Sequence, residues 1–566
     1  MPQPLRDSLT EYPRIMLEAI AEGWGIALTD EQSPEVVDRL AAEMVDPESV
    51  QFVLRRLSEM EREALAYVSA LGQVKVHVMT RKYGAIRHLG PGRLEWEAAW
   101  RQPVSSAERL WFLGLIYREY AQDERYHGEV VYIPAELRTA LPPLSIELPT
   151  FRVEPAPNPT APHTRAKNAG RHTGTRDGIP MVQDDGDALA RDVYVVLAYV
   201  RNHQVRERTP KRGYGVPTRE SARLRRDSRG YAVRPGGLRP NGRVPKGILT
   251  ARELAALRPR LAGSSDPQRL RFLLHLCAKG GFIGAEEGLW VPTAEAATWL
   301  KGSDIARQRA LYRTWLDDTD WNELWLMPGV HCENTGWRND PLLPRQTVVD
   351  YLRQCPVATW WTIRSFVESI HGVAPDLMRP DGDYDSWYIR DVQTGQYWMG
   401  WGSWPKVEGA LIGYLLQQPL RWLGVVATGQ PEGEVDAGCF MLTRQGAAVL
   451  GAGDVAPTPK SHRLRRASTG YGVPSQPQLM TVQGDLQVLV PHGASWYDRF
   501  LLERFATWVS EKDGTAHYRM DARSVHACVS SGVTLEQMLA FLRRVSGNRL
   551  PPAAVRSLQD WATDQK

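Results

Sequence analysis

Two stretches of the sequence are rich in arginine and lysine, whose side chains could bind phosphate groups. Between Arg201 and Lys246, fourteen Lys and Arg residues stand against three acidic residues, a local charge of +11 in a chain of net charge +4. The remainder of the chain is therefore near −7. Arginine donates paired hydrogen bonds to phosphate oxygens, and such contacts give affinity without selecting a base sequence. Basicity confined to one stretch indicates a polyanionic partner rather than a requirement of the fold.

Part of this basic sequence occurs twice. Residues 223–233 read RLRRDSRGYAV and residues 463–473 read RLRRASTGYGV. Both copies lie in Gly- and Pro-rich surroundings that cannot build a core. We interpret them as flexible basic arms for a phosphate backbone, with Tyr231 and Tyr471 available to stack on bases. The other interpretation is a duplicated low-complexity insertion that is simply soluble.

The predicted nucleic-acid contacts are cations of the basic stretches 201–246 and 460–466. The predicted residues are Arg201, Arg206, Arg208, Lys211, Arg212, Arg223, Arg225, Arg226, Arg229, Lys246, Lys460, Arg463, Arg465 and Arg466.

Catalytic signatures are missing from the sequence. A helicase motor needs a G-x-x-x-x-G-K-[ST] loop to hold its nucleotide, and the sequence contains none. It also lacks H-E-x-x-H and G-x-S-x-G patterns. Its five cysteines are scattered and never form a C-x-x-C pair, which argues against a disulfide framework or a structural zinc site. We predict a protein that is not an enzyme and uses no metal or cofactor.

The elements that carry these cations are predicted to be mainly helical. In residues 58–146, the sequences at Ser58 and Ser105 resemble capping boxes and each precedes a helix, with a third helix at Val76–Tyr83 between them. Two apolar strands follow, near residues 115–117 and 130–133. Three helices followed by a two-stranded ribbon are the winged-helix order.

Two further units have a similar pattern. One starts at Asp192, is interrupted by the basic stretch, and resumes at Thr250 with a third capping box. Its last helix spans residues 269–278 and two strands follow. The other spans about 342–451. Thirteen of the twenty tryptophans lie between Trp290 and Trp422. These rings could form a stacking platform for single strands, but their spacing among Leu, Val and Tyr favours core packing.

The predicted fold class is mainly α with small β-ribbons (α+β), in which tandem winged-helix-like units precede a small C-terminal α/β module. The predicted segments are N-terminal helices (1–57), winged-helix-like unit 1 (58–146), a linker (147–186), winged-helix-like unit 2 (187–299) with a basic insertion (201–249), a Trp-rich helical connector (300–341), winged-helix-like unit 3 (342–453), a basic linker (454–475) and the α/β module (476–566).

The C-terminal module resembles a known family. The order is LMTVQGDLQVLVP at 479–491, a helix through Phe500 to Val509, HYRM at 517–520 and then two short helices, the helix that starts at Thr534 being followed by two prolines. This order is similar to the helicase-associated domain found beside XPB-type DNA helicases and in stand-alone bacterial relatives. The sequences PLRWLGVV at 419–426 and TRQGAAVLG at 443–451 extend the resemblance to the middle of the chain.

The resemblance implies an accessory part of a DNA machine without its motor. We expect a non-catalytic scaffold or accessory subunit that binds DNA with low specificity, with a helicase or sister subunit as a further partner. Two alternatives stay open, namely a protein–protein adaptor built of winged helices and a sequence-specific transcription regulator. No apolar run approaches the roughly 18 residues that a membrane span needs, and no signal peptide is evident. We therefore expect a cytoplasmic protein without membrane contact.

Overall fold

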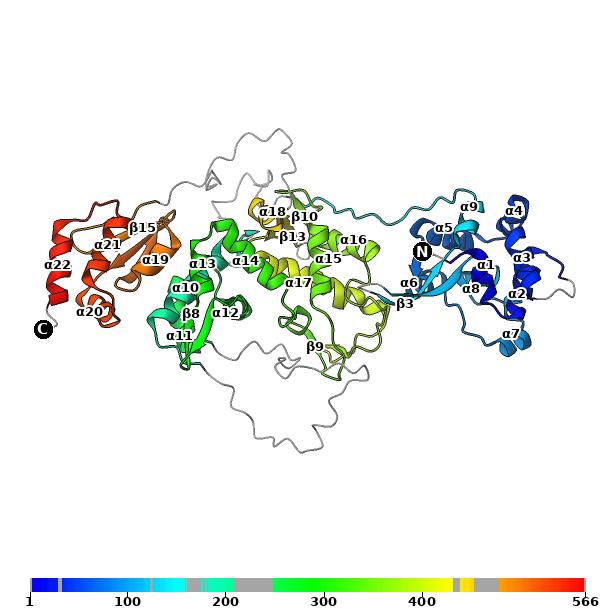
Figure 1. Ribbon diagram of the computed structural model, residues 1–566, viewed down its shortest axis with the longest axis horizontal. Helices are drawn as coiled ribbons and strands as arrows, with labels where there is room; N and C mark the ends of the chain where they lie inside the picture. The colour runs from blue at the N-terminus through cyan, green and yellow to red at the C-terminus, as the bar shows by residue number, and fades with distance from the viewer. Residues whose placement is uncertain are drawn as a thin grey trace, which may run out of the picture. The chain divides into compact units, whose positions relative to one another are not determined.

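The computed structural model describes residues 3–28, 33–122, 126–157, 159, 175–176, 179–180, 182–207, 248–430, 438–451 and 478–563. The chain forms two compact units. Unit 1 consists of Met1–Phe151, His371–Trp387 and Met399–Trp401, and unit 2 consists of Arg152–Ile370, Tyr388–Trp398 and Gly402–Lys566. Figure 1 draws the first 151 residues in blue to cyan and the C-terminal module in orange to red.

Unit 1 is mainly helical with one small sheet. Its elements up to residue 151 are α1 (Leu5–Thr10), α2 (Arg14–Trp24), α3 (Ser33–Glu43), α4 (Pro47–Arg55), α5 (Glu59–Leu71), β1 (Gln73–Lys75), α6 (Val76–Tyr83), α7 (Pro91–Glu97), η1 (Ala99–Arg101), α8 (Ser106–Phe112), β2 (Tyr117–Gln122), β3 (His127–Tyr132) and α9 (Ala135–Ala140).

The second half of unit 1 follows the predicted order of helices and ribbon. The capping box at Ser58 is formed and α5 ends at Gly72, while α6 covers the predicted Val76–Tyr83. The strands are antiparallel in the order β1-β3-β2, so the short strand before α6 pairs with the last strand of the ribbon. One apolar core joins this part to α1–α4.

The capping box predicted at Ser105 is only half formed. The Ser105 hydroxyl accepts the backbone N–H of Glu108, as a cap requires. The Glu108 carboxylate, however, does not return to Ser105, because it is fully buried and paired with the Arg87 guanidinium at 2.7 Å. It also accepts the N–H of Val104. A long-range ion pair therefore replaces the local contact that the sequence suggested.

Unit 2 contains most of the remaining elements. Between residues 152 and 451 they are β4 (Thr175–Arg176), β5 (Ile179–Pro180), β6 (Val182–Gln183), α10 (Ala188–Asn202), α11 (Ala251–Leu257), η2 (Arg258–Arg260), α12 (Pro267–Lys279), β7 (Ile283–Glu286), β8 (Leu289–Pro292), α13 (Ala294–Lys301), α14 (Asp304–Leu316), η3 (Glu323–Trp325), β9 (Val330–Cys332), α15 (Leu342–Leu352), β10 (Trp360–Thr362), α16 (Ile363–Val373), β11 (Ile389–Asp391), η4 (Trp401–Ser403), η5 (Pro405–Gly409), α17 (Ala410–Leu415), η6 (Leu416–Leu420), β12 (Val426–Gly429), β13 (Cys439–Leu442) and α18 (Arg444–Leu450).

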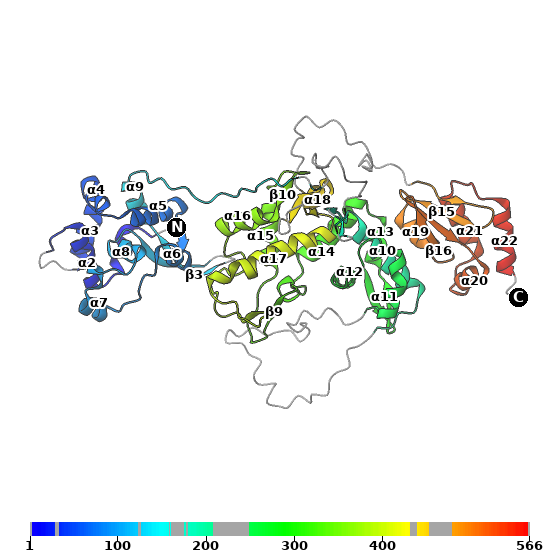
Figure 2. The ribbon, with the colours of Figure 1, turned by 180° about the vertical axis from the view of Figure 1, so that it is seen from behind.

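The element order of unit 1 recurs twice in this stretch. In the first recurrence α10, α11 and α12 precede the β7–β8 ribbon, and Arg206 forms a bridge with Leu289 of β8. In the second, α15, α16 and the continuous helical stretch 405–420 precede the β12–β13 ribbon, and β10 pairs with β13. Figures 1 and 2 show α15 and α17 side by side, in agreement with their contacts. The shared pattern is a helix, a strand or bridge that pairs with the ribbon, further helices and then the ribbon. Unit 1 has α7 and η1 in addition, and the first recurrence has an isolated bridge in place of the strand.

Part of the predicted linker 147–186 belongs to the sheet of the second recurrence. Strand β6 pairs with β12, which gives a four-stranded sheet in the order β10-β13-β12-β6. The N–H of Glu154 also donates to the Ser365 hydroxyl at 2.9 Å. Backbone hydrogen bonds along a sheet edge need no apolar periodicity in the added strand, so no sequence pattern indicated this pairing.

The tryptophans of the central region pack into cores, as predicted. None of the thirteen between Trp290 and Trp422 is exposed, and Trp315, Trp404 and Trp422 are among the largest fully buried side chains. The most exposed large apolar side chain of the described residues is instead Trp96 in unit 1, at 85%. The five cysteines are buried thiols, and none of them forms a disulfide.

The C-terminal module is a small α/β layer. Its elements are β14 (Thr481–Val482), β15 (Gln487–Pro491), α19 (Trp496–Leu502), β16 (Thr507–Lys512), β17 (Thr515–Arg519), α20 (Ala522–Ser530), α21 (Leu535–Val545) and α22 (Pro552–Thr563).

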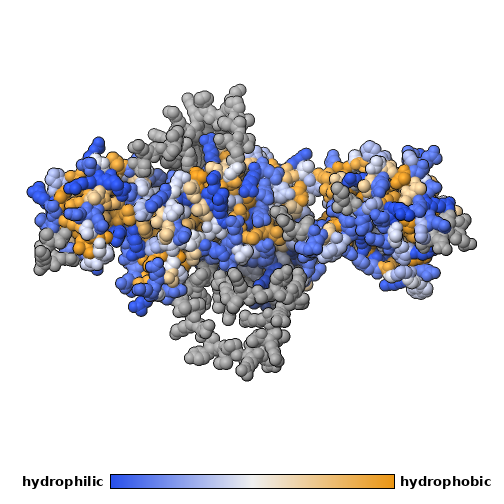
Figure 3. All heavy atoms as spheres, in the orientation of Figure 1, coloured by the Kyte–Doolittle hydropathy of each residue, from blue (hydrophilic) through white to orange (hydrophobic). Residues whose placement is uncertain are grey.

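An antiparallel sheet in the order β14-β15-β17-β16 shares one apolar core with the module's helices. In the view of Figure 3, polar and apolar residues are interspersed on its surface. The predicted α+β class, mainly helical with small ribbons, is confirmed; the predicted boundaries of the eight segments stay a prediction.

Among the described helices, none is both long and apolar enough to cross a membrane alone. One bent pair, α20 with α21 at 118°, passes the same test by length and composition.

Candidate nucleic-acid interface

The structure describes two of the fourteen cations predicted to bind nucleic acid, Arg201 and Arg206. The other twelve lie outside the described residues: Arg208, Lys211, Arg212, Arg223, Arg225, Arg226, Arg229, Lys246, Lys460, Arg463, Arg465 and Arg466. Their role in phosphate binding stays a prediction.

Arg201 lies in the last turn of α10 and contacts the C-terminal module. Its guanidinium carbon is 3.6 Å from the centroid of the Phe500 ring, and the same group donates to the backbone carbonyl of Phe500. Burial lowers the pKa of Arg201 to about 10, because removal from water disfavours the charged form. The structure therefore places Arg201 inside a contact within the chain.

Arg206 is exposed at the edge of the β7–β8 ribbon. Its backbone forms a bridge with Leu289, and the next residue, Glu207, donates its N–H to the Gly288 carbonyl at 2.7 Å. The start of the predicted basic insertion is therefore fixed on unit 2, and the Arg206 side chain is available to a ligand.

In helix-turn-helix proteins, including the winged-helix variant, the last helix of the unit is the one that enters a DNA groove. In α8 the buried side chains include Leu110 and Phe112, and the one cation, Arg109, forms an ion pair with Glu61 at 3.3 Å. A helix with this composition offers no side chains for the edges of bases.

The corresponding helix of the first recurrence, α12, is covered by other parts of unit 2. Phe272 packs on Trp321 and Trp422, with ring centroids 5.1 and 5.4 Å apart. The Gln268 side chain donates to the Leu326 carbonyl at 2.9 Å. The helical stretch 405–420 of the second recurrence is likewise mostly buried. These two helices hold the unit together and leave little surface for a DNA groove.

The β7–β8 ribbon is also unsuited to DNA. Its turn carries Glu286 and Glu287, and both are exposed. Carboxylates at this position would repel a phosphate backbone. This ribbon is therefore a poor candidate for a phosphate contact.

A buried carboxylate fixes the C-terminal module on the central part of unit 2. Glu503 follows α19 and is 5% exposed. Its carboxylate accepts hydrogen bonds from the Tyr194 hydroxyl at 2.8 Å, the Tyr518 hydroxyl at 2.7 Å and the Arg260 guanidinium at 2.6 Å. Burial alone would raise the pKa of Glu503, but Arg260 and the tyrosine hydroxyls outweigh it, and the pKa is lowered. The carboxylate therefore stays charged, and one of its oxygens, Oε1, accepts all three hydrogen bonds.

A second carboxylate extends this contact. Glu511 of β16 lies between Arg191 of α10 at 2.7 Å and Arg499 of α19 at 3.1 Å. Burial acts to raise the pKa of Glu511, yet the two guanidinium groups lower it overall. The side chain of Asn202 adds a hydrogen bond to the Glu503 carbonyl at 3.0 Å. We call the contact formed by Arg191, Tyr194, Arg260, Arg499, Glu503, Glu511 and Tyr518 the docking network.

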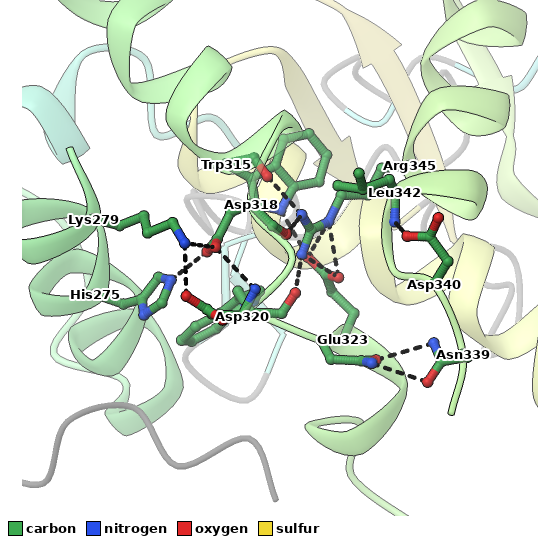
Figure 4. Close-up of polar contacts among 12 residues, drawn as sticks. His275, Lys279, Trp315, Asp318, Asp320, Glu323, Asn339, Asp340, Leu342 and Arg345 are labelled. Atoms are coloured by element: carbon green, nitrogen blue, oxygen red, sulfur yellow. Dashed lines mark hydrogen bonds and ion pairs between the residues drawn. The ribbon is translucent and has the colours of Figure 1, made fainter. Parts of the chain in front are cut away.

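A second polar cluster lies in the central part of unit 2 (Figure 4). Arg345 is fully buried, forms an ion pair with Glu323 at 2.9 Å, and donates to the backbone carbonyls of Trp315 and Asp318 at 2.6 Å. Asp318 contacts His275 and, at 2.9 Å, Lys279. Burial acts to raise the pKa of Asp318, but hydrogen bonds from His275, the backbone and Lys279 hold it well below its usual range.

This cluster lacks the parts of a catalytic site. A His–Asp pair orients a base in many hydrolases, but a nucleophile must lie beside the base. Here the histidine is buried next to Trp321, at 5.1 Å between ring centroids. Within the described parts of the chain, no group of three His, Cys, Asp or Glu residues could hold a metal ion. The cluster thus ties α12 to the loop after α14.

Reasoning from the sequence missed the docking network. Glu503 stands in the sequence LLERF, where a lone carboxylate between apolar residues was the available sign. Its partners Tyr194 and Arg260 lie about 300 and 240 positions away, so that no local pattern links them.

The C-terminal module matches a known family. Residues 480–564 match the family model of the helicase conserved C-terminal domain. A comparison with curated proteins gives no match. The match supports the predicted likeness of this module to a helicase-associated domain.

Proposed function

We propose that this chain is a non-catalytic scaffold or accessory subunit of a DNA helicase, repair or transcription machine. It binds nucleic acid mostly through phosphate contacts and with little sequence preference. Its C-terminal module, of the XPB-associated type, contacts a helicase or sister subunit.

One observation carries the proposal: the helicase-type module is docked on the helix that leads into the basic segment. Helix α10 holds the module through Tyr194, Arg201 and Asn202. This helix ends at Asn202, only six positions before the basic residues 208–247 begin. The second basic segment directly precedes β14 of the same module. One basic segment therefore follows the helix on which the module docks, and the other precedes the module itself.

The buried third helices support phosphate contact rather than base reading. Bases are read by side chains that reach their edges in a groove. Helix α8 presents none, and the exposed cations of α12 are limited to Arg271 and Lys279, of which Lys279 is paired with Asp318 and Asp320. Cationic segments instead neutralise phosphates and release counterions, which gives affinity that depends steeply on salt. The threefold recurrence of helix, strand or bridge, further helices and ribbon supports a winged-helix-like architecture in which these helices pack within the chain.

The test compares two variants of equal charge change. The first is R223Q/R225Q/R226Q/R229Q in the basic segment. The control is R252Q/R258Q/R338Q/R444Q, whose four arginines are exposed elsewhere in unit 2. We expect the first variant to bind unrelated duplexes about 10- to 100-fold more weakly, with a salt slope reduced by about 3 to 4, since each phosphate contact contributes roughly 0.9 to the slope.

The control variant should bind like the wild type. Equal weakening in both variants would show that net charge alone attracts DNA, and an effect on one sequence only would support a transcription regulator.

A protein–protein adaptor is the second candidate, favoured by the same buried helices. It predicts that the wild-type chain binds no duplex even at about 50 mM salt, where phosphate contacts are strongest.

A further inference from the structure

A concave surface lies on the C-terminal module, where α21 gives way to α22. Its volume is about 450 Å³, and it is lined by Arg543, Asn548, Leu550, Pro552, Val555 and Arg556. We call it the arginine concavity. Two guanidinium groups, one amide and an apolar floor thus face one space.

The turn between the two helices shapes this surface. Gly547 and Asn548 both have left-handed backbone conformations, with φ of 62° and 63°. The N–H of Asn548 donates to the Arg543 carbonyl at 2.7 Å. This tight turn brings Arg543 at the end of α21 close to Arg556 of α22, so the spacing of the two cations is set by the fold.

The two arginines of the concavity lack partners in the described part of the chain. Both are exposed, and neither side chain forms an ion pair there. The neighbouring Arg544 differs, because it pairs with Asp498 at 2.8 Å. The lining contains no acidic residue, and a further exposed cation, Arg549, lies in the same turn. The site therefore has uncompensated positive charge.

We propose that the arginine concavity binds the phosphodiester backbone of nucleic acid. Guanidinium groups on two sides suit a phosphate, because each can donate two parallel hydrogen bonds. The apolar residues Leu550, Pro552 and Val555 suit the adjoining sugar. This inference rests on the proposed function and extends it from the basic segments to a folded surface.

A polyanion explains this surface better than an isolated acidic peptide. One basic segment precedes β14 of this module and the other follows α10, on which the module docks, so one long strand can engage them and the concavity together. Linked sites raise the effective concentration of ligand at each other. An acidic peptide is kept as an outcome of the test.

The test uses the full chain and two double variants of equal charge change. R543E/R556E reverses the concavity. R519E/R523E reverses two exposed arginines of β17 and α20 that do not line it. Binding of a 20-nucleotide single strand, a 20-base-pair duplex and a glutamate-rich peptide is measured by fluorescence anisotropy at one salt concentration. The milder R543Q/R556Q provides a second variant should the reversal disturb folding.

We expect R543E/R556E to bind one or both nucleic acids at least tenfold more weakly, and R519E/R523E to change affinity by about twofold at most. The nucleic acid whose affinity falls more, the single strand or the duplex, is then identified as the ligand. If R543E/R556E and its control behave alike while the wild type binds DNA, the inference is overturned and the proposed function stands.

If the wild type binds neither nucleic acid, the proposed function fails as well. Binding of the peptide with loss in R543E/R556E, and no effect on DNA, would assign the concavity to an acidic protein instead.

Discussion

The C-terminal module uses arginine in opposite ways on two of its surfaces. At the docking network, Arg260 and Arg499 are paired with Glu503 and Glu511 at 2.6 and 3.1 Å. At the arginine concavity, Arg543 and Arg556 are exposed and have no ion-pair partner among the described residues. The comparison separates cations that maintain the structure from cations that are free for a ligand.

The difference has a simple physical origin. A charge removed from water must be paired and hydrogen-bonded, or its burial costs several kcal/mol. An exposed guanidinium group carries no such requirement and can exchange water for phosphate. Substitutions in the docking network should therefore change stability, and substitutions in the concavity should change binding.

The largest effect is expected for Glu503→Ala. It leaves Arg260, Tyr194 and Tyr518 buried without their shared acceptor, which should cost about 3–5 kcal/mol. Hydrogen exchange should show much faster exchange in α10 and α19 than in the wild type. The control is Glu536→Ala, an exposed position on α21. Unchanged protection in α19 would show that the docking network does not hold the module.

Acid should release the same contact. The pKa values of Glu503 and Glu511 are lowered in the folded chain. A lowered carboxylate pKa contributes stability above the unfolded value, about 4.3, and this stability is lost as pH falls through the folded pKa. Protection of α19 should therefore be constant from about pH 7 to 5 and should decrease only below about pH 4. A loss between pH 7 and 6 would point to a histidine instead.

The docking contact should depend less on Arg201. Arg201→Ala removes one ring contact and one hydrogen bond to Phe500, worth about 1–2 kcal/mol together. A modest rise of exchange in α19 is expected. The matched control, Arg252→Ala, changes an exposed arginine of α11. A loss as large as that of Glu503→Ala would make Arg201 the main anchor.

Almost no loss of stability is expected at the concavity. R543Q/R556Q changes exposed side chains without ion-pair partners in the described chain, so its unfolding free energy should stay within about 0.5 kcal/mol of the wild type. Thermal unfolding measures this directly. A loss above about 2 kcal/mol would show that these arginines belong to the fold and would erase the contrast between the two surfaces.

The sequence predicted features that depend on neighbouring residues. The caps at Ser58 and Thr250 and the strands of the β7–β8 ribbon follow from spacings of a few positions. The tryptophan cores were predicted from apolar neighbours in the same way.

Features that depend on distant partners were not predicted. The Glu108 side chain was expected to cap its own helix, but it pairs with Arg87. The pairing of β6 with β12 and the partners of Glu503 also required the fold. For the candidate site, composition identified the basic segments, whereas the concavity depends on a turn that brings Arg543 and Arg556 together.

The central claim is that this chain binds nucleic acid through phosphates. The most direct measurement is the affinity of the full chain for two unrelated duplexes of equal length across a salt series. Our account predicts equal affinities and a log–log salt slope of about −5 or steeper, which corresponds to roughly six phosphate contacts. No binding at low salt, or a preference of about 100-fold or more for one duplex, would contradict it.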